Sequence, residues 1–460
     1  MTERAEVIVV GMGPGGEEVA GRLAEAGLDV LAIEAKLLGG ECPYWGCVPS
    51  KMMIRAANLL AEGRRIPGMA GAAIVTPDWA PVARRIRDEA TDSWNDQVAV
   101  DRFVKKGGRF LRGRARLVGP RTVEVDGVGY EASRALVINT GTEPAIPPID
   151  GLADTPYWTN REAIETESVP ESLAVIGGGS IGLELGQVFA RFGAHVTVVE
   201  ARDRLLAIEE PEASALAAEA MARDGVTVHV GASAREVSHD LDTGFTVTLG
   251  DGAEPVSAQR LLVATGRHAD LAGLGAAALG IPADARYLSI DDYCRVSDGV
   301  WALGDATGKG PFTHVSMYQA AIVIRDILNG GCDAGSGPPA DYRALPRVTF
   351  TDPEIGTVGL TEAEAREQDI PVRVGLSQAP SSARGWIHKA GNEGFIKIVE
   401  DTNRGVLVGG TSAGPVGGEV LGALVVAVHA EVPVERLRHM MYAYPTFHRG
   451  IEDALRSLDG

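Results

Sequence analysis

Short apolar runs alternate with amphipathic stretches along much of the chain. Two of these runs, residues 7–10 and 173–176, are rich in β-branched residues and end in a cluster of glycines. An Ala- and Leu-rich stretch with helical periodicity follows each cluster, and after it come a glycine, a second apolar run and an acid. Strands that alternate with helices in this way are typical of βαβ units in a parallel sheet. The pattern predicts an α/β fold that contains the same unit twice.

The rest of the chain carries further elements without such a repeat. A charged helical region is expected over about residues 77–106, and a β-rich stretch is expected up to Asn139. Residues 330–339 are rich in Gly, Ser and Pro, and are expected to link to a separate domain over residues 348–460. The most apolar segment of that domain, 420–428, is shorter than the roughly 20 residues of a membrane span and is predicted to be a buried helix.

Both glycine clusters have the spacing of a dinucleotide-binding turn. Residues 11–16 and 177–182 each read G-x-G-x-x-G, and Glu34 and Glu200 each follow the first glycine by 23 residues. The first glycine allows a tight bend, the second lets backbone N–H groups approach a pyrophosphate, and the third lets the helix pack on the strand. The acid accepts hydrogen bonds from a ribose hydroxyl. Two complete units predict two bound dinucleotides.

Two cysteines lie close together, shortly after the first unit. Cys42 and Cys47 have the spacing C-x4-C and are expected beside the first dinucleotide. Pro49 stands where a first helical residue would, which puts Cys47 at a helix N-terminus, where the dipole favours a thiolate. No metal site is expected, because no further Cys or His follows until His195. A dithiol that can form a disulfide beside a dinucleotide predicts a redox relay.

Composition mainly excludes other classes of protein. Of the 460 residues, 45% are hydrophobic and 23% are charged, as in ordinary globular proteins of several domains. The net charge of −19 argues against nucleic acid and anionic membrane as partners, so small ligands are expected. The first residues lack the pattern of a signal peptide and four cysteines cannot form a disulfide framework, so the cytoplasm is the expected compartment. Cys294 and Cys332 are expected to be buried structural residues.

Together these motifs resemble the flavoprotein disulfide reductases of the pyridine nucleotide-disulfide oxidoreductase class. The resemblance rests on the two glycine units, on the Gly-Gly-x-Cys-x4-Cys-Val-Pro-Ser-Lys segment, on Ala-Thr-Gly-Arg, on Gly-Asp at 304–305 and on residues 351–360. It spans essentially the whole chain. It implies two Rossmann-like dinucleotide-binding domains, for FAD and NAD(P), and a C-terminal α+β dimerisation domain of a homodimer. The implied segments are 1–145 and 266–336 for FAD, 146–265 for NAD(P) and 337–460 for the interface.

The resemblance also implies roles for single residues. Hydride passes from the nicotinamide to the flavin, the flavin reduces the disulfide through Cys47, and Cys42 attacks the substrate. Lys51 is expected beside the flavin, paired with Glu184. The implied cofactor contacts are Gly11, Gly13, Pro14, Gly15, Gly16, Glu34, Ala35, Gly40, Glu41, Lys51, Ala115, Thr140, Gly141, Gly177, Gly179, Ser180, Ile181, Gly182, Glu184, Glu200, Gly266, Arg267, Gly304, Asp305, Phe312, Thr313 and His314.

One segment departs from the family pattern. Most members carry His-Pro-Thr-x-x-Glu near the C-terminus, where this chain has Tyr444 in place of the His and Arg449 in place of the Glu. Tyr444 thus replaces the group that protonates the leaving thiolate. His448 is predicted in the first turn of the final helix, either as a substitute acid or as a surface or dimer-contact residue. Residues 44 and 45, which are Tyr and Trp, and Glu41 also depart from the pattern, so the substrates of the family do not transfer.

Several functions stay open. The leading hypothesis is an FAD-dependent NAD(P)H:disulfide oxidoreductase, acting on a small-molecule disulfide or another electron acceptor. NADH is expected to be preferred because the carboxylate of Glu200 repels a 2′-phosphate, unless Arg202 or Arg204 reaches that phosphate. The alternatives are reduction of a quinone or metal ion directly by reduced flavin, a thiol oxidase that runs in reverse, and a flavoprotein that acts as a binding or redox-sensing partner.

Overall fold

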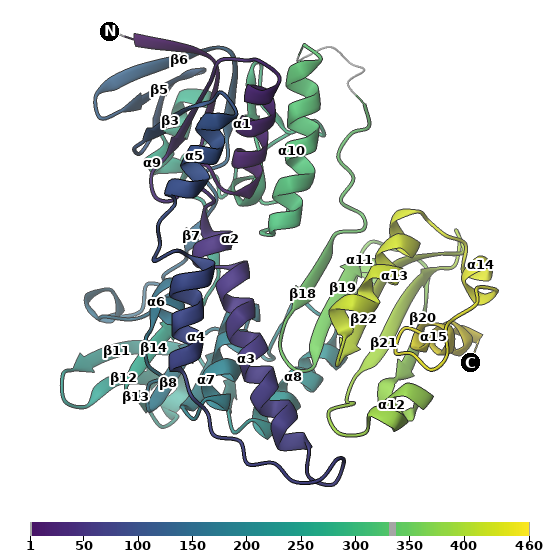
Figure 1. The fold of residues 1–460 in the computed structure, drawn as a ribbon. Helices are drawn as coiled ribbons and strands as arrows, with labels where there is room; N and C mark the ends of the chain where they lie inside the picture. Colours follow the sequence, from purple (N-terminus) through teal and green to yellow (C-terminus); the bar gives the residue numbers. More distant parts are fainter. Residues whose placement is uncertain (1, 331–336, 460) are drawn as a thin grey trace. The chain divides into compact units, whose positions relative to one another are not determined.

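The computed structural model describes residues 2–330 and 337–459, and its contacts divide the chain into two compact units. The first unit comprises residues 1–49, 84–145 and 266–342. The second comprises residues 50–83, 146–265 and 343–460. Helix α3 (Cys47–Arg65) begins in the first unit and continues into the second (Figure 1). The expected division into FAD, NAD(P) and interface segments stays a prediction, and Cys332 lies outside the described residues.

A largely parallel sheet forms the centre of the first unit. Its strand order is β16-β17-β6-β1-β2-β3, in which only the edge strand β16 runs antiparallel to its neighbour. The strands are β1 (Thr2–Val10), β2 (Val30–Glu34), β3 (Arg109–Arg112), β4 (Arg116–Gly119), β5 (Thr122–Val125), β6 (Val128–Ile138), β16 (Arg295–Ser297) and β17 (Val300–Ala302), and β4 and β5 extend β6 as an antiparallel pair. The helices are α1 (Pro14–Glu25), α2 (Glu41–Tyr44), α5 (Gln97–Lys105), α9 (Leu271–Leu274) and α10 (Thr313–Leu328).

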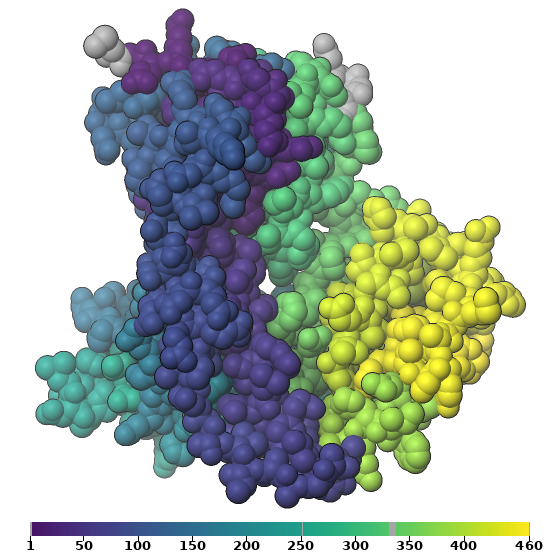
Figure 2. Space-filling view, in the orientation of Figure 1, coloured from purple at the N-terminus to yellow at the C-terminus, as the bar shows by residue number. Residues whose placement is uncertain are grey.

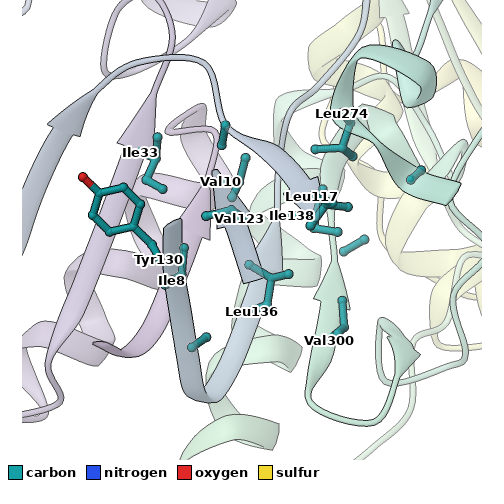
Figure 3. Close-up of a cluster of buried hydrophobic side chains, with 14 of the residues drawn as sticks. Ile8, Val10, Ile33, Leu117, Val123, Tyr130, Leu136, Ile138, Leu274 and Val300 are labelled. Atoms are coloured by element: carbon teal, nitrogen blue, oxygen red, sulfur yellow. The ribbon is translucent and has the colours of Figure 1, made fainter. Parts of the chain in front are cut away.

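Both faces of this sheet are buried. Ile8 and Val10 of β1 point into the cluster shown in Figure 3, which also contains Leu136 and Val300. Val7 and Val9 of β1 point to the other face and pack in a second cluster with apolar side chains of α1 and α10. Successive side chains of a strand point to opposite faces, so a strand buried on both sides needs the unbroken apolar run seen in the sequence.

The second unit contains a parallel sheet of order β10-β9-β8-β14 and a three-stranded antiparallel sheet. The parallel strands are β8 (Ser172–Ile176), β9 (His195–Glu200), β10 (Thr227–Val230) and β14 (Arg260–Val263), and the antiparallel strands are β11 (Ala234–Asp240), β12 (Gly244–Leu249) and β13 (Val256–Ala258). The accompanying helices are α6 (Asn160–Glu165), α7 (Ser180–Arg191) and α8 (Pro211–Arg223). Helix α4 (Ala80–Arg85) begins in this unit, and the π-helical turn Ile86–Ala90 that continues it belongs to the first unit. This βαβ arrangement repeats that of the first unit, as the two glycine clusters predict.

The C-terminal part of the second unit is an antiparallel sheet with helices, and its last residues are yellow in Figures 1 and 2. The strand order is β18 (Pro346–Thr349), β19 (Glu354–Gly359), β22 (Val406–Gly414), β21 (Phe395–Asp401) and β20 (Val372–Gln378). Its helices are α11 (Glu362–Glu367), α12 (Ala383–His388), α13 (Gly417–His429), α14 (Val434–Arg438) and α15 (Gly450–Arg456). The predicted α/β fold with two Rossmann-like domains and a C-terminal α+β domain is confirmed.

Three sequence-based expectations need correction. The segment 420–428 belongs to α13, but only one face of this helix is buried, because the helix packs on one side of a sheet, and Val426 remains 63% exposed. Helix α3 starts at Cys47, so Pro49 is its third residue; Pro is tolerated there because the first-turn N–H groups lack helical partners. The helical region 77–106 is interrupted by three residues with positive φ, Asp92 to Trp94.

Among residues 2–330 and 337–459, no helix has both the length and the apolar character required to cross a membrane.

Candidate active site

The glycine turns have the backbone geometry that a dinucleotide site requires. Gly11 and Gly177 have φ of +90° and +115°, and a Cβ on either would lie within 2.4 Å of a backbone oxygen of the neighbouring strand end. A Cβ on Gly16 would lie 2.1 Å from the carbonyl oxygen of Gly11, and Gly182 stands in the same relation, also 2.1 Å, to Gly177. A Cβ on Gly179 would instead meet open space. The first and third glycines thus permit the turn, and the second leaves the N-terminus of α7 accessible.

The acids at the ends of the second strands are fixed by the same hydrogen bonds in both units. One carboxylate oxygen accepts from the N–H of the residue after the first glycine, and the other accepts from the N–H two residues after the acid. Both oxygens of each acid are therefore fixed before a ribose binds. The donors are Met12 and Lys36 for Glu34, both at 2.7 Å, and Gly178 at 2.6 Å and Arg202 at 2.7 Å for Glu200.

The predicted site residues of the first unit gather where its parallel strands end. This carboxyl edge is where α/β sheets bind ligands. Residues 11–16 follow β1, Glu34 ends β2, Thr140 and Gly141 follow β6, and residues 304–305 follow β17. The same unit contains residues 312–314 at the start of α10, Ala35 after β2, Ala115 before β4, and Gly40, Glu41, Gly266 and Arg267. The second unit contains Lys51, residues 177–182, Glu184, Glu200, Tyr444 and His448.

A hydrogen-bonded chain that the sequence analysis missed connects Asp305 to Arg267. The hydroxyl of Thr142 donates to Asp305 Oδ2 at 3.0 Å and accepts from Arg267 Nε at 2.9 Å. Arg267 also donates to the carbonyl oxygen of Thr142 at 2.7 Å and lies 3.8 Å from the Glu41 carboxylate. Burial raises the pKa of Asp305, and Thr142 and Arg267 oppose this shift. The position of Thr142 directly after Thr140 and Gly141 is the only sequence signal for it.

The two cysteines of the C-x4-C segment are in the thiol form and lie in contact. Cys42 is half-buried in α2, and Cys47 is exposed as the first residue of α3. Cys47 Sγ is hydrogen-bonded to Thr313 Oγ1 at 3.3 Å. The hydrogen bond to Cys47 raises the pKa of Cys42 well above the ordinary thiol range, and burial adds to this shift. The two sulfurs thus differ in environment.

The loop that carries the cysteines is anchored by a buried acid. Asp96 Oδ2 accepts from the N–H of Leu38 at 2.6 Å and from Arg112 Nη2 at 2.5 Å. Tyr44 is buried, and burial, followed by the negative charge of Asp96, raises its pKa. The ring of Trp45 lies beside that of Tyr44, with centroids 5.9 Å apart. The two bulky residues that depart from the family pattern therefore pack with the base of the loop.

In the second unit, Lys51 and Glu184 form the ion pair that the resemblance implies. Lys51 Nζ lies 2.9 Å from Glu184 Oε2, and the side chain of Glu184 is only 7% exposed. The other oxygen of Glu184 accepts from the N–H of Phe350 at 2.8 Å. The ring of Phe350 lies under the ammonium, with its centroid 4.5 Å from Nζ. The sequence analysis did not single out Phe350, although it directly precedes the family-like segment 351–360.

The C-terminal segment brings the two substituted residues together. The guanidinium carbon of Arg449 lies 5.2 Å from the centroid of the Tyr444 ring, which is 67% exposed. The prediction that His448 lies in the final helix is wrong, since α15 begins at Gly450. The segment makes a turn instead, in which the N–H groups of Gly450 and Ile451 donate to the carbonyl oxygens three residues back, of Phe447 and His448, at 2.9 and 3.0 Å. The ring of Phe447 lies 5.5 Å from that of His388. Within the described part of the chain, no group of three or more His, Cys, Asp or Glu side chains is arranged to hold a metal ion.

Comparisons with known proteins agree with this geometry. Residues 5–320 match the family model of the pyridine nucleotide-disulphide oxidoreductases, and residues 345–455 match the dimerisation domain of that family. The chain is 33% identical to dihydrolipoyl dehydrogenase of Chlorobaculum tepidum, over 98% of this chain and 96% of that protein. It is also 33% identical to mercuric reductase of Acidithiobacillus ferrooxidans, over 99% of this chain and 83% of that protein.

Solved structures show the same fold over the full length. LpdA from Mycobacterium tuberculosis is 27% identical, with a TM-score of 0.84 over 99% of this chain and 100% of that chain. The flavoprotein disulfide reductase RclA from Escherichia coli, at 24% identity, has a TM-score of 0.85 over 99% of both chains. By name these relatives include a dehydrogenase, a mercuric reductase and a flavoprotein disulfide reductase. This chain belongs to the pyridine nucleotide-disulphide oxidoreductase family.

Proposed function

We propose that the protein passes electrons from NADH through FAD and the Cys42/Cys47 pair to an acceptor disulfide whose reduction needs no imidazole acid. The observation that carries this proposal is the contact between the two thiols at the head of α3, with Lys51 one helical turn further along the same helix and paired with Glu184. A dithiol in contact can close to a disulfide and reopen, which is the chemistry of a redox relay.

The residues of the first unit fit FAD. The backbones at Gly13 and Gly40 approach closely, since a Cβ on Gly40 would lie 2.8 Å from the Cα of Gly13, and the N-terminus of α1 offers N–H groups to a pyrophosphate. Glu34 would accept hydrogen bonds from the adenosine ribose, and Asp305 would accept them from the ribityl chain. When bound, FAD supplies hydride transfer from reduced nicotinamide and two-electron reduction of a disulfide.

The second unit fits NADH better than NADPH. Both oxygens of Glu200 are fixed by backbone N–H groups, which holds the negative charge where the adenosine ribose would bind. Arg204 donates Nη2 to the carbonyl oxygen of Ala207 at 2.8 Å, so that donor is engaged within its own loop. A fixed carboxylate accepts from a 2′-hydroxyl and repels a 2′-phosphate. We therefore propose NADH as the preferred donor.

The proposed thiol chemistry uses the hydrogen-bonded contact between Cys42 and Cys47. As the attacking sulfur, Cys42 must lose its proton, and its hydrogen-bond partner Cys47 is the group in contact that can accept it as a thiolate. Cys42 then forms a mixed disulfide with the acceptor and releases one thiolate. Cys47 passes the proton to that thiolate, and its own thiolate then attacks the sulfur of Cys42, which closes the internal disulfide and releases the second thiolate. Two electrons thus leave the dithiol, and the acceptor disulfide becomes one thiol and one thiolate.

The proposed assembly is a cytoplasmic homodimer joined through the C-terminal segment, with neither nucleic acid nor membrane as a partner. The match of residues 345–455 to a dimerisation domain supports the dimer. The acceptor is proposed to be a small molecule. The replacement of the family's His and Glu by the stacked pair Tyr444 and Arg449 supports an acceptor outside the usual substrates of the family.

The test is steady-state oxidation of NADH by the FAD-loaded protein with a panel of disulfides, quinones and mercuric ion. Under the proposal, Cys42→Ser abolishes turnover of the active disulfide. Two-electron reduction gives a long-wavelength absorbance band that depends on the Cys47 thiolate and is lost in Cys47→Ser. Undiminished turnover by Cys42→Ser would identify the runner-up function, direct reduction of a quinone or metal ion by the flavin. Absence of turnover with every acceptor would favour a redox-sensing role.

A further inference from the structure

One face of α7 is bonded to a single turn of the C-terminal segment, residues 349–353. Its polar side chains recur at positions 180, 184, 187 and 191, which lie on one side of a helix. Each of them makes a hydrogen bond or ion pair with the turn. These are Ser180 Oγ to Thr349 Oγ1 at 2.8 Å, Glu184 Oε1 to Phe350 N at 2.8 Å, Gln187 Oε1 to Asp352 N at 2.8 Å, and Arg191 Nη2 to Asp352 Oδ2 at 2.7 Å.

Helix α3 holds the same turn from another side. Arg65 Nη2 lies 2.6 Å from Asp352 Oδ2, and Arg191 also donates to Asn58 of α3 at 2.6 Å. Arg191 is buried, with 3% of its surface exposed, so its own contacts are shielded from water. The turn is therefore fixed by side chains of both helices, and one of them, α3, also carries Lys51.

Phe350 is the residue of this turn that reaches Lys51. Its N–H holds Glu184, whose other oxygen binds Lys51 Nζ at 2.9 Å, and its ring faces the same ammonium at 4.5 Å. Lys51 is a long, flexible side chain that is 37% exposed, so it needs restraints to keep its charge in one place. The carboxylate attracts the charge from one direction, and the face of the ring attracts it from another.

We propose that Phe350 is a positioning residue that fixes the ammonium of Lys51. The inference rests on the proposed function, in which Lys51 acts beside the flavin. The backbone N–H of Phe350 orients Glu184 whatever its side chain, whereas the aromatic ring acts on Lys51 directly. Only the second effect is lost when the ring is replaced by an aliphatic side chain, which makes the role of the ring measurable.

The test compares Phe350→Leu, Phe350→Tyr and Lys51→Met in the FAD-loaded protein. Phe350→Leu keeps the backbone N–H and most of the apolar volume but removes the ring. We expect the flavin reduction potential of this variant to shift in the same direction as in Lys51→Met, and less far. We expect NADH to reduce the flavin about two- to five-fold more slowly, as loss of one partly exposed cation–π contact implies. Phe350→Tyr keeps the ring, so its flavin reduction potential and its rate of flavin reduction by NADH should match those of the unmodified protein.

A matched control separates this role from general loss of stability. Phe245→Leu removes a buried ring of β12 in the same unit and should leave the flavin potential unchanged. If Phe350→Leu does not bind FAD, Phe350→Met serves in its place. A shift in Lys51→Met without any shift in the Phe350 variants would overturn the role of Phe350 alone. Lack of a shift in Lys51→Met would overturn the proposed place of Lys51 and this inference with it.

Discussion

Arg449 lies over the ring of Tyr444, and its guanidinium also forms an ion pair with Glu452 at 3.1 Å. The two residues that replace the family's His and Glu are thus partners of each other. A tyrosine phenol, with an ordinary pKa of about 10, cannot both accept and donate a proton near pH 7 as an imidazole can. The pair offers a hydroxyl and a fixed cation in place of an acid–base group.

We therefore expect weak lipoamide and glutathione reduction by the unmodified protein. Replacing Tyr444 with His and Arg449 with Glu together should raise lipoamide turnover at pH 7 about 100-fold, the usual contribution of a positioned acid–base group. In Tyr444→His alone, lipoamide turnover should rise less, because the neighbouring Arg449 disfavours the protonated imidazole. The control is Tyr444→Phe, which keeps an aromatic ring beside Arg449 and should not raise lipoamide turnover. Rapid lipoamide turnover by the unmodified protein would contradict this reading.

The contact between the cysteines predicts a distinct pH dependence of alkylation. Because the pKa of Cys42 is raised, its thiolate fraction at a given pH is lower than for an ordinary cysteine, and alkylation of Cys42 in the reduced protein should need alkaline pH. Cys47→Ala removes the hydrogen bond to Cys47, which is the larger cause of the raised pKa of Cys42, and leaves burial as the remaining cause. The pH at which Cys42 reacts should therefore fall while staying above the ordinary range. Mass spectrometry of the Cys42 peptide measures this, and an unchanged profile in Cys47→Ala would refute it.

The fixed carboxylate of Glu200 predicts the choice of electron donor. The kcat/KM should be higher with NADH than with NADPH. Glu200→Ala should lower kcat/KM with NADH about ten-fold, the size expected for lost hydrogen bonds to a charged group. The ratio of kcat/KM with NADH to kcat/KM with NADPH should therefore fall toward one. Glu34→Ala is the matched control from the first unit, since it should reduce the FAD content of the protein without changing this ratio. A clear preference of the unmodified protein for NADPH would mean that nearby arginines outweigh the acid.

The buried network around Asp352 predicts how acid affects the second unit. Burial alone would raise the pKa of Asp352, but the guanidinium groups of Arg191 and Arg65 outweigh it and hold the pKa below its usual value. An acid with a lowered folded-state pKa stabilises the fold above its unfolded pKa of about 3.9, and this contribution is lost as the pH falls further.

Arg191→Met leaves two partly buried carboxylates, Asp224 and Asp352, short of a partner. It should lower the free energy of unfolding by about 3 kcal/mol at neutral pH, and by less as the pH falls below about 4 toward the lowered pKa of Asp352. Urea unfolding at both pH values measures the difference. Arg223→Met removes an exposed ion pair of 3.7 Å in the same unit and should cost less than about 1 kcal/mol. Equal losses from the two variants would rule out a special role for the buried network.

The sequence predicts the parts of the site that depend on local backbone demands. The glycine turns, the acids at Glu34 and Glu200, and the place of Cys47 at a helix start all follow from spacing within one βαβ unit or loop. The contacts of Phe350 with Lys51 and of Thr142 with Asp305 join residues far apart in sequence, and no local pattern signals them. The position of His448 differs from the prediction because the backbone before α15 forms hydrogen bonds to carbonyl oxygens three residues back, and the spacing of the sequence does not reveal this tighter turn.

Glu34 and Glu200, each held by two backbone hydrogen bonds, also affect the entropy of ligand binding. A free glutamate side chain loses rotational freedom worth about 1.5 kcal/mol when it is immobilised. At Glu34 and Glu200 this loss occurs during folding, because two backbone N–H groups already hold each carboxylate. The two backbone hydrogen bonds therefore let each site meet a ribose with a rigid acceptor, without an ordering step at the moment of binding.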